Sequence, residues 1–234
     1  MTAIFWKEVK SYFYSPMAYI LIGLFILLTS IFFFPNLTYS YGDFTGNLSN
    51  MGFILLFIVP ILTMRILAED RKNGTEVLLI TSPASITSMV VGKYLAACFV
   101  FLIMTVLTFI YPIVLLAFGA TFTPMLVGGY IGFILLGATF ISVGVFASSL
   151  TENQIIAVVI SFVSLLIMWL AGSLTTMVGG IAAKILGWFS LMTRYEDFSR
   201  GILGLGPVVY YLSFIAVFLF LTIRVIEKRR WSQG

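Results

Sequence analysis

Six stretches of the chain are apolar and about long enough to cross a membrane as helices, and polar segments separate them. Crossing the hydrocarbon layer takes about 20 apolar residues in a helix. We therefore expect six membrane spans, at residues 17–34, 51–68, 94–117, 125–147, 155–175 and 207–223. Pro60 and Pro112 lie inside two of these spans, where a membrane helix tolerates proline as a kink. The pattern predicts an all-α integral membrane protein with a single transmembrane domain, residues 1–234.

Residues 1–15 precede the first span and are too charged to cross the membrane themselves. Phe5, Val9 and Phe13 recur every four residues, whereas Lys7 and Lys10 fall on another face. This periodicity predicts an amphipathic helix that lies in the membrane interface. The alternative is the basic start of a signal peptide, but no small-x-small cleavage site ends the apolar run that follows.

Residues 69–93 connect the second and third spans and contain a short amphipathic segment, Glu76–Ile80. Gly74 precedes this segment, and the hydroxyl of Thr75 is suited to cap a helix that begins there. Glu76 would place negative charge at the positive end of the helix dipole. Pro83 closes the segment after about two turns, because a proline disfavours helix at the residue before it. Such a short helix cannot cross a bilayer, so its apolar face requires the membrane surface or another protein.

Residues 176–206, between the fifth and sixth spans, are interrupted by charge. Ile181, Ile185, Trp188 and Phe189 fall on one helical face, and Lys184 prevents a seventh crossing. We expect short amphipathic helices at the outer surface of the membrane here.

Composition supports the membrane assignment and gives an orientation. The chain is 61% hydrophobic and 9% charged, with a mean hydropathy of +1.11, which is far outside the range of soluble domains. Ten of the 13 basic residues would lie on one side of the membrane, and only Lys184, Arg194 and Arg200 on the other. This bias places both termini and residues 69–93 in the cytoplasm of a multi-pass cell-membrane protein. The basic residues are then a topology signal, and no nucleic-acid partner is needed to explain them.

Several kinds of chemistry are missing from the sequence. The chain has no histidine and one cysteine, Cys98, so no Cys/His metal site or disulfide can be assembled within it. No charged residue lies in the middle of an expected span, which argues against an ion-coupled transporter. Gly92 and Lys93 are followed by Tyr94, and Thr87 stands where a phosphate-binding loop would have its first glycine. We therefore expect neither an enzyme nor a cofactor in this chain, and the energy for any transport must come from elsewhere.

Small residues are concentrated in the fourth expected span. Gly128 and Gly132 form a Gly-x-x-x-Gly pair, which permits close contact with another helix. Packing within one chain and a contact between two copies both fit this pattern.

The connection between spans 2 and 3 resembles the cytoplasmic loop of ABC-2-type permeases. The resemblance rests on the run from Glu69 to Glu76, then Leu78-Leu79, Ser82-Pro83 and Gly92-Lys93. It extends over the whole chain as an interfacial helix, six spans and an outer amphipathic region. Lys7-Glu8, Ser11-Tyr12-Phe13 and Ser15-Pro16 are most similar to permeases of gliding-motility transport systems. One departure is Gly204, where that family often has an acidic residue.

The resemblance implies a permease subunit that pairs with a second permease and with two ATP-binding subunits, which would hold the ATP and Mg²⁺. It implies that the loop helix docks in a groove of the ATPase and couples hydrolysis to export of an apolar or amphipathic substrate. The docking and coupling residues would be Glu69, Gly74, Thr75, Glu76, Val77, Leu78, Leu79, Ile80 and Pro83. Glu69 and Glu76 would pair with basic groups of the ATPase, or locally with Arg71 or Lys72. The apolar anchors would be Leu78 and Leu79, with Val77 or Ile80 beside them.

Two other functions remain open at the level of sequence. The first alternative is a non-transporting membrane subunit that uses the same docking to move an outer accessory protein. The second is a stand-alone secondary transporter, which the absence of charged residues within the spans disfavours.

Overall fold

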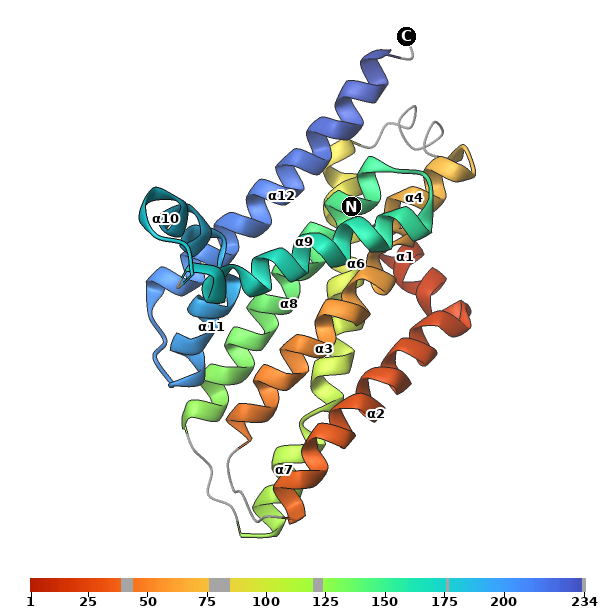
Figure 1. Ribbon diagram of the computed structural model, residues 1–234. Helices are drawn as coiled ribbons and strands as arrows, with labels where there is room; N and C mark the ends of the chain where they lie inside the picture. Colours follow the sequence, from red (N-terminus) through yellow and green to blue (C-terminus); the bar gives the residue numbers. More distant parts are fainter. Residues whose placement is uncertain (39–43, 76–84, 120–123, 176, 233–234) are drawn as a thin grey trace.

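Helix α8, Pro124–Leu150, is the central element of the fold in the computed structural model (Figure 1). The structure describes residues 1–38, 44–75, 85–119, 124–175 and 177–232. In these ranges it is all-helical, with these remaining elements: α1 Thr2–Tyr14, α2 Pro16–Thr38, α3 Thr45–Thr63, α4 Arg65–Lys72, α6 Ile86–Leu107, α7 Ile110–Ala117, α9 Gln154–Thr175, α10 Gly180–Phe189, α11 Leu191–Ser199 and α12 Leu205–Ser232. Helices α3, α6, α9 and α12 pack against α8, whereas α2 packs on α3.

Six stretches of helix are long and apolar enough to cross a membrane, which confirms the fold class expected from the sequence. They are Pro16–Pro35, Gly46–Lys72, Ile86–Ala117, Pro124–Leu150, Gln154–Thr175 and Leu205–Arg229. The second and fourth are largely buried in the protein, whereas the first, fifth and sixth expose most of their apolar surface. An apolar surface of this extent is stable in lipid and not in water. The protein is therefore a multi-pass membrane protein.

Glycines on α8 allow its neighbours to approach closely. A Cβ atom added at Gly132 would lie 2.6 Å from the Cβ of Phe198 in α11, and one at Gly128 would lie 2.9 Å from the Phe198 carbonyl. Further along, Gly137 contacts Phe101 of α6 and Gly144 contacts Thr63 of α3. The small residues of this span thus form three contacts within the chain, and the face of Gly128 and Gly132 is covered by α11.

Several helices extend further than the sequence suggested. Helix α2 continues through Pro35, which we expected to end it, and α3 begins at Thr45 instead of Met51. Helix α6 begins at Ile86 instead of Tyr94, capped by the Ser85 hydroxyl, which accepts from the Ser88 amide at 3.2 Å. At the other end, α12 runs through the basic residues expected to form a tail.

The region between α9 and α12 is helical, as expected, but its two helices differ. Helix α10 exposes Ile181 and Trp188. Helix α11 instead buries Leu191, Tyr195 and Phe198 completely against α8 and α9. It therefore packs as part of the helix bundle and not only along its surface.

The two prolines expected to kink spans lie near real interruptions. Helix α3 continues through Pro60 and ends at Thr63, and α4 begins two residues later. Helices α6 and α7 are separated at Thr108 and Phe109, four and three residues before Pro112. Because proline lacks an amide hydrogen, the Thr108 carbonyl loses its usual helical partner. That carbonyl accepts instead from the Tyr111 amide at 3.1 Å and from the Tyr130 hydroxyl at 3.2 Å.

Candidate functional site

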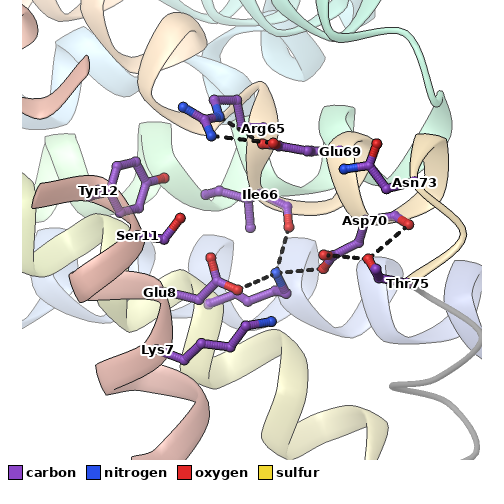
Figure 2. Close-up of a pocket in the computed structure, with 11 residues that line it drawn as sticks. Lys7, Glu8, Ser11, Tyr12, Arg65, Ile66, Glu69, Asp70, Asn73 and Thr75 are labelled. Atoms are coloured by element: carbon purple, nitrogen blue, oxygen red, sulfur yellow. Dashed lines mark hydrogen bonds and ion pairs between the residues drawn. The ribbon is translucent and has the colours of Figure 1, made fainter. Parts of the chain in front are cut away.

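A lysine is buried where three helices meet. We call this end of the bundle, formed by α1, α4, the first turns of α6 and the last turns of α8, the basic end (Figure 1). The ammonium of Lys93, whose side chain is 2% exposed, lies 2.7 Å from Glu8 Oε1 and 2.7 Å from Asp70 Oδ2. It also donates to the Ile66 carbonyl at 2.8 Å, so the ammonium contacts three oxygens on α1 and α4, with hydrogen bonds to Glu8 and Ile66 and an ion pair with Asp70 (Figure 2). We call Lys93, Glu8 and Asp70 the ion triad.

The sequence around Lys93 explains how α1 comes close enough to reach it. Gly92 faces α1, and a Cβ at this position would lie 3.3 Å from both the Met1 carbonyl and Ile4 Cγ2. The absence of a side chain at Gly92 lets the two helices pack closely, which places Glu8 beside Lys93. One ammonium against two carboxylates leaves the ion triad with one excess negative charge when both acids are ionised.

The end of α4 is bonded to the ion triad through Asp70. The Thr75 hydroxyl donates to Asp70 Oδ1 at 3.0 Å and lies 3.2 Å from the Asp70 carbonyl. Gly74, between them, has a φ of +69°, in the left-handed region that favours glycine. Thr75 was expected to cap a following helix, and that cap would involve residues outside the described part.

A serine of α8 forms hydrogen bonds with backbone groups where α3 ends and α4 begins. The Ser148 hydroxyl of α8 accepts from the Leu67 and Ala68 amides at 3.1 Å each and donates to the Met64 carbonyl at 3.1 Å. Ser148 therefore caps α4 from a distant part of the chain, because the first amides of a helix have no carbonyl partner within it. We expected Ser148 to begin a polar connection; it lies instead inside α8 and is buried.

Helix α1 is also bonded to α3 just before this interruption. The Tyr12 hydroxyl donates to the Leu62 carbonyl at 2.8 Å. Burial, together with the charge of Glu8, raises the pKa of this hydroxyl well above its usual range, so it stays protonated as a donor. Helix α1 is thus held to α6 by an ion pair and to α3 by a hydrogen bond.

Glu69 has a different partner from those we considered. Its carboxylate pairs with Arg65 one turn earlier, at 2.7 Å, and not with Arg71 or Lys72. Arg65 also lies 3.4 Å from Ser15 Oγ and 3.4 Å from Met17 Sδ, at the start of α2. The second candidate span is therefore linked to the start of the first.

A polar pocket of about 190 Å³ opens beside the ion triad. Its lining comes from α1, α4 and α6 and consists of Lys7, Glu8, Ser11, Tyr12, Arg65, Ile66, Glu69, Asp70, Asn73, Thr75 and Lys93 (Figure 2). Three basic and three acidic side chains surround it. In the described ranges, no group of three His, Cys, Asp or Glu side chains is arranged to hold a metal ion.

Most residues expected to dock a partner lie outside the part of the chain that the structure describes. They are Glu76, Val77, Leu78, Leu79, Ile80 and Pro83. Of the remaining candidates, Glu69, Gly74 and Thr75 lie together at the end of α4, beside the ion triad. Asp70 and Thr75, before 76–84, and Lys93, after it, therefore belong to one bonded cluster.

The ion triad and Ser148 were missed by reasoning from the sequence. Lys93 was placed in a polar connection, because the apolar run becomes uninterrupted only at Tyr94. Its two partners lie 85 and 23 residues away along the chain, and no local pattern connects them. A useful signal was the Gly92-Lys93 pair itself, since a glycine beside a charge at a helix end is suited to close packing.

No known protein family and no curated protein matches this chain.

Proposed function

We propose that the chain is the permease subunit of an ABC transporter of the ABC-2 type. It would form the translocation path with a second permease subunit, identical or different, and a separate ATP-binding subunit would supply the energy. The basic end would face the cytoplasm, and the direction would be export of an apolar or amphipathic substrate. The resemblance of residues 69–93 to the ABC-2 loop and the six candidate spans support this proposal.

One structural observation carries the proposal beyond the resemblance. Residues 76–84 join α4 to α6, and the ends of these helices are bonded to each other and to α1 and α8. Thr75 bonds Asp70, Asp70 pairs with Lys93, Lys93 pairs with Glu8, and Ser148 bonds the start of α4. A displacement of residues 76–84 would therefore be transmitted through these bonds to α4, α6, α1 and α8. Such a linked element is what coupling between a soluble motor and membrane helices requires.

The test is whether residues 76–84 hold an ATP-binding subunit. The tagged full chain is purified in mild detergent from its own membranes, either unchanged or with Leu78→Asp and Leu79→Asp together. The unchanged chain should carry an ATP-hydrolysing subunit, and the double variant should lose it. Burial of each leucine is worth about 1.5–3 kcal/mol, and the new carboxylates would be desolvated at the contact.

The matched control is Thr87→Asp with Asn153→Asp, which adds two carboxylates at exposed positions of the same end. It should keep the partner. Retention of the partner and of full hydrolysis by the Leu78/Leu79 variant would show that the segment does not dock the ATPase. ATP-driven flux in vesicles then separates a permease from a subunit that only moves an accessory protein. Loss of that flux on adding an uncoupler at constant ATP would favour a secondary transporter.

Orientation is tested by cysteine labelling in a Cys98→Ala background. Asn50 serves as the outer position because it is exposed, whereas the neighbouring Asn47 is only 4% exposed. A membrane-impermeant thiol reagent applied outside should react with a cysteine at Asn50 and not with one at Asn73. The reverse result would place the basic end outside and contradict the proposal.

A further inference from the structure

The pocket beside the ion triad has a charge arrangement that the proposed function does not explain. At its inner side, the ion triad carries one excess negative charge when both acids are ionised, and Glu8, which lines the pocket, pairs with Lys93 through Oε1 only (Figure 2). At its rim, Lys7 and Ser11 lie one turn apart on the same face of α1. The pocket therefore has a negative side and a positive side.

Three donors in the lining have no partner among the described residues. They are the ammonium of Lys7, the hydroxyl of Ser11 and the side-chain amide of Asn73. Arg65 is committed to Glu69, and the Lys93 ammonium already contacts Glu8, Asp70 and the Ile66 carbonyl. The available groups are thus donors for an anion at the rim and carboxylate oxygens for a cation further in. A simple anion would face the excess negative charge, and a simple cation would face Lys7.

The size and place of the pocket limit what could fill it. A volume of about 190 Å³ equals the liquid volume of about six waters and is below the range of about 300–1,000 Å³ usual for whole ligands. Helix α1 leads directly into the first candidate span, and its Trp6 and Tyr14 are 55% and 85% exposed. Exposed aromatic side chains of this kind lie at headgroup depth. Arg65 reaches the first residues of α2, beyond which Ile20 and Leu24 expose apolar surface.

We propose that this pocket binds the zwitterionic headgroup of phosphatidylethanolamine. The phosphate would lie at Lys7 and Ser11 on α1, and the primary ammonium would lie toward Glu8 in the ion triad. The acyl chains would follow the exposed face of α2. The same phosphoethanolamine chemistry occurs in soluble glycerophosphoethanolamine, so the test includes both sources.

The experiment is native mass spectrometry of the purified, delipidated full chain. Equal amounts of phosphatidylethanolamine, phosphatidylcholine and phosphatidylglycerol with the same acyl chains are added. One phosphatidylethanolamine should be retained at least fivefold more than either other lipid. Phosphatidylcholine has no N–H to donate to Glu8, and phosphatidylglycerol has no cation for it. Glycerophosphoethanolamine should compete only at much higher concentration, because it lacks the acyl chains.

Two variants test the two ends of the headgroup separately. Lys7→Gln should lower the affinity for phosphatidylethanolamine about three- to fivefold, as expected for an exposed charge contact. The control Lys10→Gln removes an exposed charge of the same helix outside the pocket lining and should leave this affinity unchanged. Glu8→Gln should abolish the preference for phosphatidylethanolamine over phosphatidylcholine. Since Glu8 also holds Lys93, the surface variant Lys7→Gln keeps the test valid if Glu8→Gln does not fold.

Three results would overturn the proposal. They are equal retention of the three lipids, equal effects of Lys7→Gln and Lys10→Gln, and binding of the soluble compound as tightly as the lipid. A Lys7→Gln variant that binds lipid normally but loses the ATPase would show that the pocket contacts a protein instead. The lipid measurements use the isolated chain, so their failure would leave the permease proposal untouched.

Discussion

Removing the charge of Lys93 should destabilise the protein strongly, although the residue is a single side chain near one end of the bundle. Lys93→Met preserves most of the side-chain volume but leaves Glu8 and Asp70 without the ammonium that lies 2.7 Å from each. Breaking a buried ion pair costs about 3–5 kcal/mol. The two carboxylate side chains are 15% and 18% exposed, so water solvates them in part and the lower value of about 3 kcal/mol applies.

The assay is thermal unfolding in detergent, followed by loss of the monodisperse protein peak. For a chain of this size, about 1 kcal/mol corresponds to about 2–4 °C, so Lys93→Met should lower the Tm by about 6–12 °C. Adding Glu8→Gln and Asp70→Asn removes the uncompensated charges and should recover at least half of this loss. Lys10→Met, at an exposed position on α1, should change stability by less than about 0.5 kcal/mol.

The reasoning would be refuted if Lys93→Met melted within about 2 °C of the unchanged chain. It would also be refuted if the triple variant were no more stable than the single one. The first result would mean that the ammonium contributes no net stabilisation. The second would mean that the loss comes from packing around Lys93 and not from the two carboxylates.

Two further predictions concern the contacts of α8 and α1. Gly132→Ala should lower the free energy of unfolding by about 1–3 kcal/mol, because the new methyl group would lie 2.6 Å from Phe198 Cβ. The control Gly23→Ala, where the added methyl group meets open space, should be neutral or slightly stabilising. Equal Tm values for the two variants would contradict the packing of α11 against α8. Burial raises the pKa of Tyr12 above its value of about 10 in the unfolded chain. The stabilisation that the neutral hydroxyl gives to the folded protein is therefore complete below about pH 10 and is lost as the pH rises further. The Tm of the unchanged chain should therefore fall more steeply from pH 10 to 11.5 than that of Tyr12→Phe, and parallel curves would show that Tyr12 is not buried as a neutral donor.

The number of spans could be predicted from the sequence, but the ends of the helices could not. The length and hydropathy of each apolar run determine whether it can cross a bilayer, so all six candidate spans were found. Helix ends depend instead on partners that are distant along the chain. Ser148, Lys93 and Asn47 looked like loop residues because they are polar, yet all three are buried within helices.

The candidate site was predictable only where its pattern is local. The glycine with positive φ at Gly74 follows from the turn chemistry of its own neighbours. The ion triad combines one residue from each of α1, α4 and α6, and its existence depends on how these helices pack. The local partner of Glu69 was also misjudged, because its carboxylate pairs with Arg65, four residues earlier, and not with Arg71 or Lys72.

The bond between Ser148 and the start of α4 has a consequence for the order of events during synthesis. The second candidate span, Gly46–Lys72, is made well before Ser148, which lies near the end of the fourth. Until that serine arrives, the amides of Leu67 and Ala68 lack the partner that they have in the finished protein. Unpaired amides are costly inside a bilayer, so the newly made second span must keep this part near water or continue as an unbroken helix. The bonds that cap the start of α4 are therefore completed late, when the fourth span packs against the second.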